Sequence, residues 1–194
     1  MKKLIAGLVI LFMTAIFCLS QPIYLDDEYE YKFLSRGDAG SCELYYICST
    51  AAELADHATH IYKGTVTGIS FTAKTVSNEK CLYTVYEVQV QNYYKGIAPM
   101  TVYISVRGGL PGYQEDEQRK VASKYNIWVT TASTYRALSI GESYLFCTNG
   151  NGANQSIISP YQFVYSEESP NYAAMLQYLT VARWTDYERF FNIL

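Results

Sequence analysis

The sequence predicts a mainly β fold: a small barrel of five or six strands, with a short helix before it and helices after it. Runs of alternating apolar and polar residues, separated by Gly- and Pro-containing turns, recur between residues 61 and 165. Hydrophobic residues make up 49% of the 194, enough to bury one core, and the 20 tyrosines suit strands. Gly64 and Gly68 inside the first strand favour a barrel, because such glycines mark bulges and bends.

Residues 1–20 are predicted to be a secretory signal. Lys2 and Lys3 precede an uncharged apolar run over residues 4–17, and Cys18 and Ser20 place small residues before a cut. The alternatives are an uncleaved anchor and a lipoprotein built on Cys18. We therefore expect a secreted or surface-exposed protein, at the membrane only if the segment stays uncleaved. Residues 21–47 form an acidic, tyrosine-rich lead-in.

A short helix follows the lead-in. In Thr50-Ala51-Ala52-Glu53, the threonine hydroxyl can accept from the Glu53 backbone N–H, and the carboxylate can reach back to the helix start. The helix is expected to extend to about His60. Its apolar stripe consists of Ala51, Leu54, Ala55 and Ala58.

The strands are predicted from alternation and from the turn residues between them. They are expected over residues 61–71, 82–94, 101–106, 143–148 and 161–165, with 127–131 as a further candidate. Residues 114–124 are charged and are expected to be helical or loop-like, and 149–154 form a Gly/Asn loop.

The C-terminal region, residues 169–194, is predicted to be a helical extension. Ser169 can cap a helix that has Pro170 at its first position. A second capping box, Thr185-Asp186-Tyr187-Glu188, predicts that another helix begins there.

Several segments together resemble a known family. They are Ile61-Tyr62-Lys63-Gly64-Thr65-Val66, Tyr83-Thr84-Val85-Tyr86-Glu87-Val88, Tyr93-Tyr94-Lys95-Gly96 and Gly141-Glu142-Ser143-Tyr144-Leu145-Phe146. The chain resembles the netrin-like domain in its bacterial secreted form, the fold of tissue inhibitors of metalloproteinases. The resemblance implies an OB-type barrel over residues 48–168 and a protease-inhibitor-like role. Those inhibitors chelate zinc through a first-residue cysteine, whereas this chain is expected to begin at Gln21, so that mechanism is not expected here.

Four cysteines remain after the signal segment. In an oxidising compartment they predict two disulfides in any of three connectivities, which the sequence leaves open. A zinc site is disfavoured because the sequence has no C-x-x-C pair. The disulfide candidates are Cys42, Cys48, Cys81 and Cys147.

The sequence contains few residue patterns typical of a catalytic site, and we expect no enzyme activity, no cofactor and no metal. Glu53, His57 and His60 are spaced i, i+4 and i+7 on the predicted helix, which would place them on one face. A metal-assisted hydrolase built on these three residues is the alternative of a different class. A polar helix face with a histidine near its C-terminal end is the favoured interpretation.

The expected function is binding of an extracellular protein, with a glycan as the alternative ligand. Removal of Lys2 and Lys3 takes the formal net charge from -3 to -5, which disfavours nucleic acid. Tyrosines can anchor a protein interface or stack on sugar rings. The candidate ligand face consists of Tyr83, Tyr93, Tyr94 and Tyr103.

Overall fold

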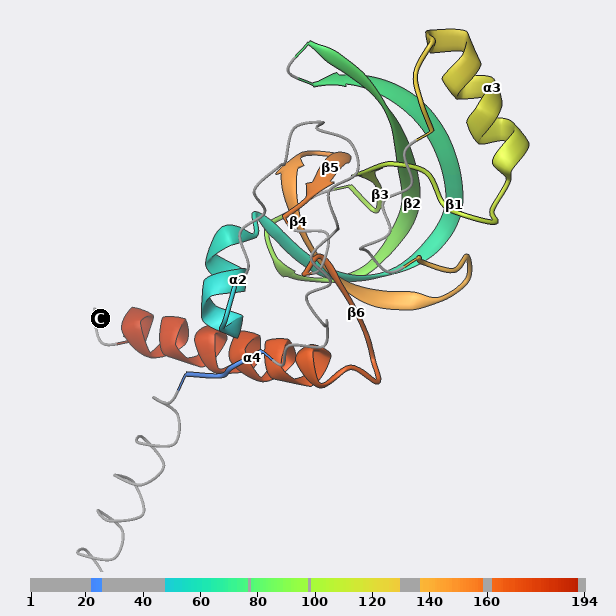
Figure 1. Ribbon diagram of the computed structural model, residues 1–194. Coiled ribbons are helices and arrows are strands. Elements are labelled where there is room, and N and C mark those ends of the chain that lie inside the picture. The colour runs from blue at the N-terminus through green and yellow to red at the C-terminus, as the bar shows by residue number, and fades with distance from the viewer. Residues whose placement is uncertain are drawn as a thin grey trace, which may run out of the picture.

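A computed structural model shows a mainly β protein with one six-stranded sheet and three helices in the part of the chain that it describes (Figure 1). The predicted mainly β class is therefore confirmed. The predicted signal segment, most of the lead-in and Cys42 lie outside the described residues. Within those residues, no helix is both long and apolar enough to cross a membrane. The described residues are 22–25, 48–76, 78–97, 99–129, 137–158 and 162–191.

The first helix, α2 (Ala51–His57), begins at the predicted capping box. The Thr50 side chain accepts a hydrogen bond from the Glu53 backbone N–H at 3.2 Å. The Glu53 carboxylate accepts from the backbone N–H of Ser49 at 2.8 Å. The helix ends before Ala58, whose backbone is extended, so it is shorter than predicted.

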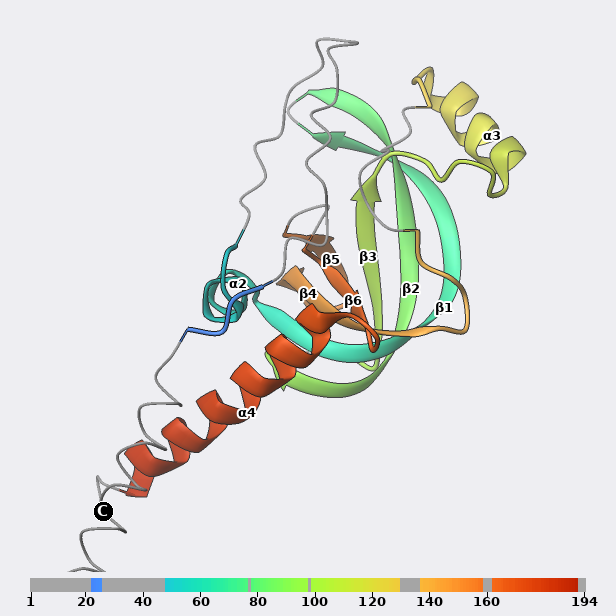
Figure 2. The same cartoon turned by 60° about the horizontal axis from the view of Figure 1, so that its bottom comes forward.

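Strands β1 (His60–Val76) and β2 (Glu79–Lys95) form a long antiparallel hairpin. Register shifts occur between Lys63 and Gly64 and between Val66 and Gly68, as the two glycines predicted. Such bulges increase the local twist of a strand. The hairpin therefore curves strongly, and its turn projects beyond the other strands (Figures 1 and 2).

The other four strands are β3 (Thr101–Arg107), β4 (Ser143–Asn151), β5 (Asn154–Ile157) and β6 (Val164–Ser166). The sheet order is β1-β2-β3-β5-β4-β6, and β4 also pairs with β1. The β3–β5 pairing is parallel, whereas the other pairings are antiparallel. Part of the predicted 149–154 loop is strand, because β4 continues to Asn151 and turns directly into β5. Residues 127–129, predicted to begin a strand, lie outside the described strands.

Two apolar clusters hold these elements together. The larger lies between strands and includes Tyr62, Tyr86, Val88, Ile104 and Phe146. The second lies between the sheet and helices α2 and α4 and includes Leu54, Ile61, Leu145, Cys147 and Met175. Alternating side chains of β4 enter opposite clusters, so this strand links them.

A polar side chain is buried beside the larger cluster. The Gln155 side-chain oxygen accepts hydrogen bonds from the Tyr62 hydroxyl at 2.7 Å and from the Thr148 hydroxyl at 2.6 Å. Buried polar groups are tolerated when they are paired in this way. These bonds attach the short strand β5 to β1 and β4.

The C-terminal region is one helix, α4 (Pro170–Phe191), rather than the two that were predicted. The Ser169 hydroxyl accepts from the Asn171 backbone N–H at 3.2 Å, as expected of a capping serine. Thr185 lies inside the helix, so the second capping box does not begin a new one. Helices α2 and α4 lie together, and α3 (Glu115–Tyr125) lies on the opposite side of the molecule (Figure 2).

Candidate binding surface

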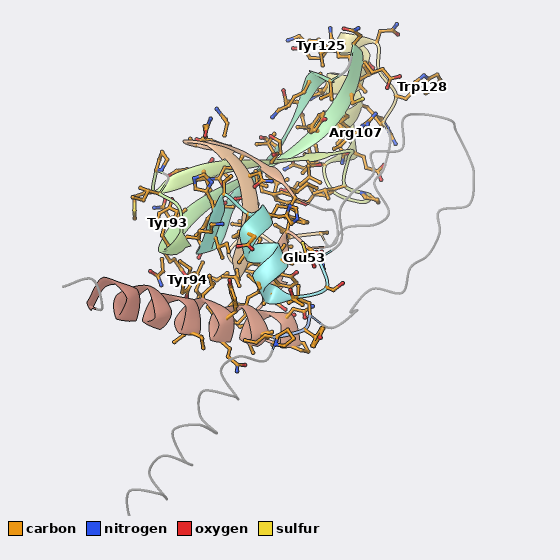
Figure 3. All side chains as sticks on the ribbon, turned by 90° about the vertical axis from the view of Figure 1, so that its left-hand side faces the viewer. Glu53, Tyr93, Tyr94, Arg107, Tyr125 and Trp128 are labelled. Atoms are coloured by element: carbon orange, nitrogen blue, oxygen red, sulfur yellow. The ribbon has the colours of Figure 1, made fainter. Side chains whose placement is uncertain are left out.

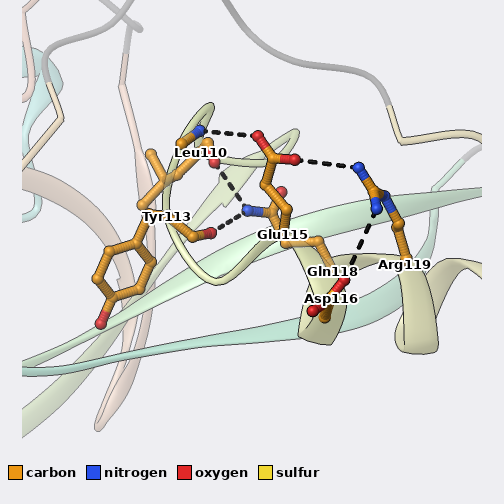
Figure 4. Close-up of polar contacts among 7 residues, drawn as sticks. Leu110, Tyr113, Glu115, Asp116, Gln118 and Arg119 are labelled. Carbon is orange, nitrogen blue, oxygen red and sulfur yellow. Dashed lines mark hydrogen bonds and ion pairs between the residues drawn. The ribbon is translucent and has the colours of Figure 1, made fainter.

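The projecting part of the molecule combines the turn of the β1–β2 hairpin with helix α3. Helix α3 packs against β1 and β2. The buried Gln118 side chain donates hydrogen bonds to the backbone oxygens of Leu110 at 2.7 Å and Tyr113 at 2.5 Å (Figure 4). These bonds fix the start of the helix to the segment that follows β3. We call the hairpin turn, α3 and residues 127–129 together the hairpin end.

The acidic residues of α3 are neutralised within the helix itself. Arg119 contacts Glu115 at 3.1 Å and Asp116 at 3.6 Å (Figure 4). Lys120 contacts Glu117 at 2.6 Å. All three carboxylates lie in the first turn, where the helix dipole favours negative charge. These three carboxylates are therefore paired with basic residues of the same helix.

The segment after α3 is held in place by the end of that helix. Asn126 adopts a left-handed conformation, with φ 52°, and its backbone N–H donates to the oxygens of Ala122 and Ser123. The Ile127 backbone N–H also donates to Ala122, at 3.0 Å. This pattern is typical of a helix C-terminus. It fixes the backbone directly before Trp128.

Aromatic and basic side chains meet at the hairpin end. Trp128 is 90% exposed, and Val129 beside it is also exposed. The ring of Tyr125 lies below two ammonium groups, with Lys80 Nζ 5.1 Å and Lys124 Nζ 5.3 Å from its centroid. Figure 3 shows Tyr125 and Trp128 at the end of the molecule remote from α4. The hairpin end thus presents the exposed Trp128 to solvent and carries two ammonium groups at the neighbouring Tyr125 ring.

A second group of side chains lies on β1, β2 and β3 of the same projecting region. The Lys74 ammonium donates to the Ser105 hydroxyl at 2.5 Å and lies 5.6 Å from the centroid of the Tyr83 ring. Arg107 donates to the Cys81 sulfur at 3.1 Å. Lys74 pairs with Cys81, and Cys81 and Tyr83 are two positions apart on β2. Ser105, which is buried, and Arg107 alternate on β3 with Ile104 and Val106 of the larger cluster, so these side chains share the face turned away from it. We call this group the Lys74 face.

The two basic side chains of the Lys74 face have different surroundings. Arg107 contacts the Glu79 carboxylate at 3.7 Å. Lys74 forms no ion pair with any described carboxylate, and burial lowers the pKa of its ammonium group from the ordinary value.

The structure separates the four tyrosines predicted to form one ligand face. Tyr83 and Tyr103 point away from the larger cluster, on β2 and β3. The Tyr93 ring lies 5.7 Å from that of the buried Tyr62. Tyr94 packs against the cluster beside α4. Figure 3 shows Tyr93 and Tyr94 far from the hairpin end, so the four do not form a continuous surface.

Glu53, His57 and His60 do not form a metal site. Helix α2 ends at His57, so the predicted helical spacing does not extend to His60, which is buried in β1. His60 Nδ1 lies 2.9 Å from the Thr59 hydroxyl, and Glu53 caps the helix. Among the described residues, no three His, Cys, Asp or Glu side chains are grouped so that they could hold a metal.

Cys48, Cys81 and Cys147 are free thiols, which corrects the expectation that they pair in disulfides. Cys81 contacts Arg107 on the Lys74 face, away from the other two, which are buried in the cluster beside α4. Burial, together with the nearby Glu53 carboxylate, raises the pKa of the Cys48 thiol to about 11. Burial also raises the pKa of Cys147, which neighbours Cys48.

These environments predict different thiol reactivities. Iodoacetamide at about pH 8 is expected to alkylate Cys81 in the folded protein and to leave Cys48 and Cys147 unmodified, because burial keeps both thiols protonated and inaccessible. Peptide mapping by mass spectrometry would measure the extent at each cysteine. The same reaction in urea should modify all three. Equal modification of the three in the folded protein would contradict the buried placement.

Comparisons supply no relative from which a function could be transferred: no protein-family model matches this chain, and no curated protein matches it. The functional argument therefore depends on the exposed aromatic residue at the hairpin end. Trp128 was not singled out from the sequence. A tryptophan that follows a charged segment is the sequence feature that could have indicated an exposed aromatic residue here.

Proposed function

We propose that the protein is a secreted or surface-exposed, non-enzymatic binding module with a netrin-like, OB-type barrel. Strand pairings that pass from β1 through β2, β3, β5 and β4 and return to β1 support this architecture. The proposed ligand is an extracellular protein, and the hairpin end is the contact surface. The 90% exposure of Trp128 is the observation that carries this proposal.

The surroundings of Trp128 favour a protein partner. Protein interfaces concentrate binding energy in a few large aromatic residues that are surrounded by polar groups. Here Trp128 and the exposed Val129 form an apolar centre, with Lys80 and Lys124 close to the neighbouring Tyr125. Sugar stacking requires an open ring face, whereas ammonium groups lie over the Tyr125 ring. A protease is one class of partner that the netrin-like resemblance supports.

Trp128→Ala is expected to weaken partner binding by about 30-fold or more, the usual loss at an interface hot spot of 2 kcal/mol. The full chain would be immobilised and exposed to the extracellular fraction of its source. Captured proteins would be identified by mass spectrometry, purified and titrated by calorimetry. Ile97→Ala is the matched control, because Ile97 is 91% exposed on a different turn.

The result has three readings. Loss of the partner with Trp128→Ala and its retention with Ile97→Ala would support the hairpin end as the contact surface. Equal binding by the two variants and the parent chain would overturn that assignment. Specific binding of a glycan, with no protein partner at a micromolar affinity, would favour the carbohydrate alternative instead.

A further inference from the structure

We propose that strand β1 binds a second copy of this chain, so that the two β1 strands pair antiparallel across a two-fold axis at Thr72. The part of the strand that takes part is residues 68–76, on the side turned away from β2, which we call the outer edge. This surface is distinct from Trp128, and the proposal does not rest on the proposed function.

The outer edge has no partner strand among the described residues. Strand β1 pairs with β4 only as far as Thr65. The next residue, Val66, exchanges hydrogen bonds with Gly141 and Glu142. From Gly68 onward the described pairings of β1 are with β2 alone. Figure 2 shows β1 as the outermost strand of this part of the sheet, so the described sheet ends there.

The pairing of β1 with β2 shows which backbone groups point outwards. In an antiparallel pair, every second residue turns its N–H and C=O groups toward the partner strand, and the others turn them away. The Leu82 oxygen accepts from the Gly108 backbone N–H at 2.8 Å, on the β3 side of β2. Ala73, which lies opposite Leu82, therefore turns its own groups away from β2. By the same alternation, the other residues with outward groups are Ile69, Phe71 and Thr75.

These outward groups are accessible to another strand. None of them forms a hydrogen bond with another described residue. Helix α3 and the segment before it cover a face of the hairpin, where the Tyr125 ring lies 5.1 Å from Lys80 Nζ and the Tyr113 ring 6.3 Å from that of Phe71. Side chains stand roughly perpendicular to a sheet, so these contacts leave its edge open.

The outer edge lacks the usual protection of an edge strand. Natural sheets blunt such an edge with prolines, charged side chains or a covering element. Residues 68–76 contain no proline and one charged residue, Lys74. Its ammonium lies over the Tyr83 ring and donates to the Ser105 hydroxyl, so it is held across the chain's own sheet. An edge of this kind is a template for another strand.

The outer edge is complementary to itself. A two-fold axis at Thr72 places Phe71 opposite Ala73 of the second copy, and Ile69 opposite Thr75. All four outward residues are then hydrogen-bonded pairs, and each pair supplies two backbone hydrogen bonds. An axis at Phe71 or at Ala73 would leave one outward residue unpaired. The axis at Thr72 also sets the bulky Phe71 against the small Ala73, which suits close side-chain packing.

The charges also permit this pairing. Lys74 lies opposite Ser70 of the second copy, because each is two positions from Thr72. The two Lys74 residues are four positions apart along the strands, about 13 Å. This separation exceeds the Debye length of about 8 Å at physiological ionic strength, so their repulsion is largely screened. Because a two-fold contact uses the outer edge of both copies, assembly ends at a dimer.

The test is the oligomeric state of the full chain. Sedimentation at about 1 to 100 µM is expected to show a reversible monomer–dimer equilibrium. Thr72→Lys sets two like charges opposite each other at the axis and is expected to weaken dimerisation about tenfold or more. Thr180→Lys is the matched control, because it adds the same charge at an exposed position of α4. A mixture of Thr72→Lys with Thr72→Glu should form a heterodimer, since opposite charges then meet.

Amide hydrogen exchange, followed by NMR, measures the same contact at single residues. The amides of Phe71 and Ala73 should exchange rapidly in dilute protein and become protected as the concentration rises. The amide of Thr72, which faces β2, should be protected at every concentration. Thermal melting would verify that each variant is folded.

Each outcome decides the proposal. Loss of the dimer with Thr72→Lys, its retention with Thr180→Lys and its recovery in the charge-reversed mixture support it. A chain that is monomeric at all these concentrations, or a dimer that responds equally to the two lysine variants, overturns it. Protection of the Ala73 amide only after addition of the captured protein partner would assign the outer edge to that partner and overturn the pairing of two copies.

Discussion

Phe146→Ala is expected to lower the free energy of unfolding by about 3–5 kcal/mol. Phe146 is fully buried on β4. Its ring stacks on Tyr62, with 5.5 Å between centroids, and meets Tyr144 edge-on at 6.0 Å. Removal of the ring loses these contacts and leaves a cavity between strands. A loss of this size is a large fraction of the 5–15 kcal/mol that typically stabilises a domain.

Urea denaturation followed by circular dichroism would measure the change. Ile140→Ala is the control, because Ile140 is 52% exposed and a surface substitution is expected to change stability by at most about 0.5 kcal/mol. A loss below about 1 kcal/mol for Phe146→Ala would contradict a closely packed core around β4.

Gly64→Ala is expected to destabilise the protein by about 1–3 kcal/mol, the cost of overpacking. A Cβ atom at this position would lie 2.6 Å from Val88 Cγ1 and 3.0 Å from the Gln89 backbone oxygen. The clash arises because β1 and β2 approach closely at the bulge beside Gly64. The methyl group can be accommodated only if the Val88 side chain and the β2 backbone shift.

Gly68→Ala provides a control in the same strand. A Cβ atom at Gly68 would lie 3.6 Å from the Glu87 side chain, an ordinary contact distance. This variant is expected to be unchanged or more stable by about 0.4–1 kcal/mol, because alanine restricts the unfolded chain. Chemical denaturation of both variants would measure the difference. Equal stabilities would show that the close approach at Gly64 does not limit the packing.

The strands could be predicted where one side of the sheet is buried. Val102, Ile104 and Val106 alternate with more polar residues, and all three lie in the larger cluster. The hairpin was predicted too short because its turn projects beyond the core. Residues near Val76 and Glu79 are exposed, so burial imposes no alternation there.

Strand β5 was missed because its buried residue is polar. Gln155 can be buried because the hydroxyl groups of Tyr62 and Thr148 donate hydrogen bonds to it. Tyr62 is 93 positions from Gln155 in the sequence, and Thr148 is seven positions from it. The Lys74 face was missed for a similar reason. Lys74 and Ser105 are 31 residues apart and meet only through strand pairing. Local patterns record which side of a strand is apolar, but not which strands become neighbours.

The pairing of β1 with β4 has a consequence for how the fold is reached during synthesis. His60 pairs with Thr148, and Thr65 pairs with Ser143. Strand β1 therefore pairs with a strand that is synthesised much later in the chain. Contacts this distant in sequence make folding slow. Until β4 has left the ribosome, the β1–β2 hairpin has one edge without its partner strand. This edge of the nascent chain therefore has no partner strand for most of its synthesis, and an unpaired edge is a segment that a chaperone can bind.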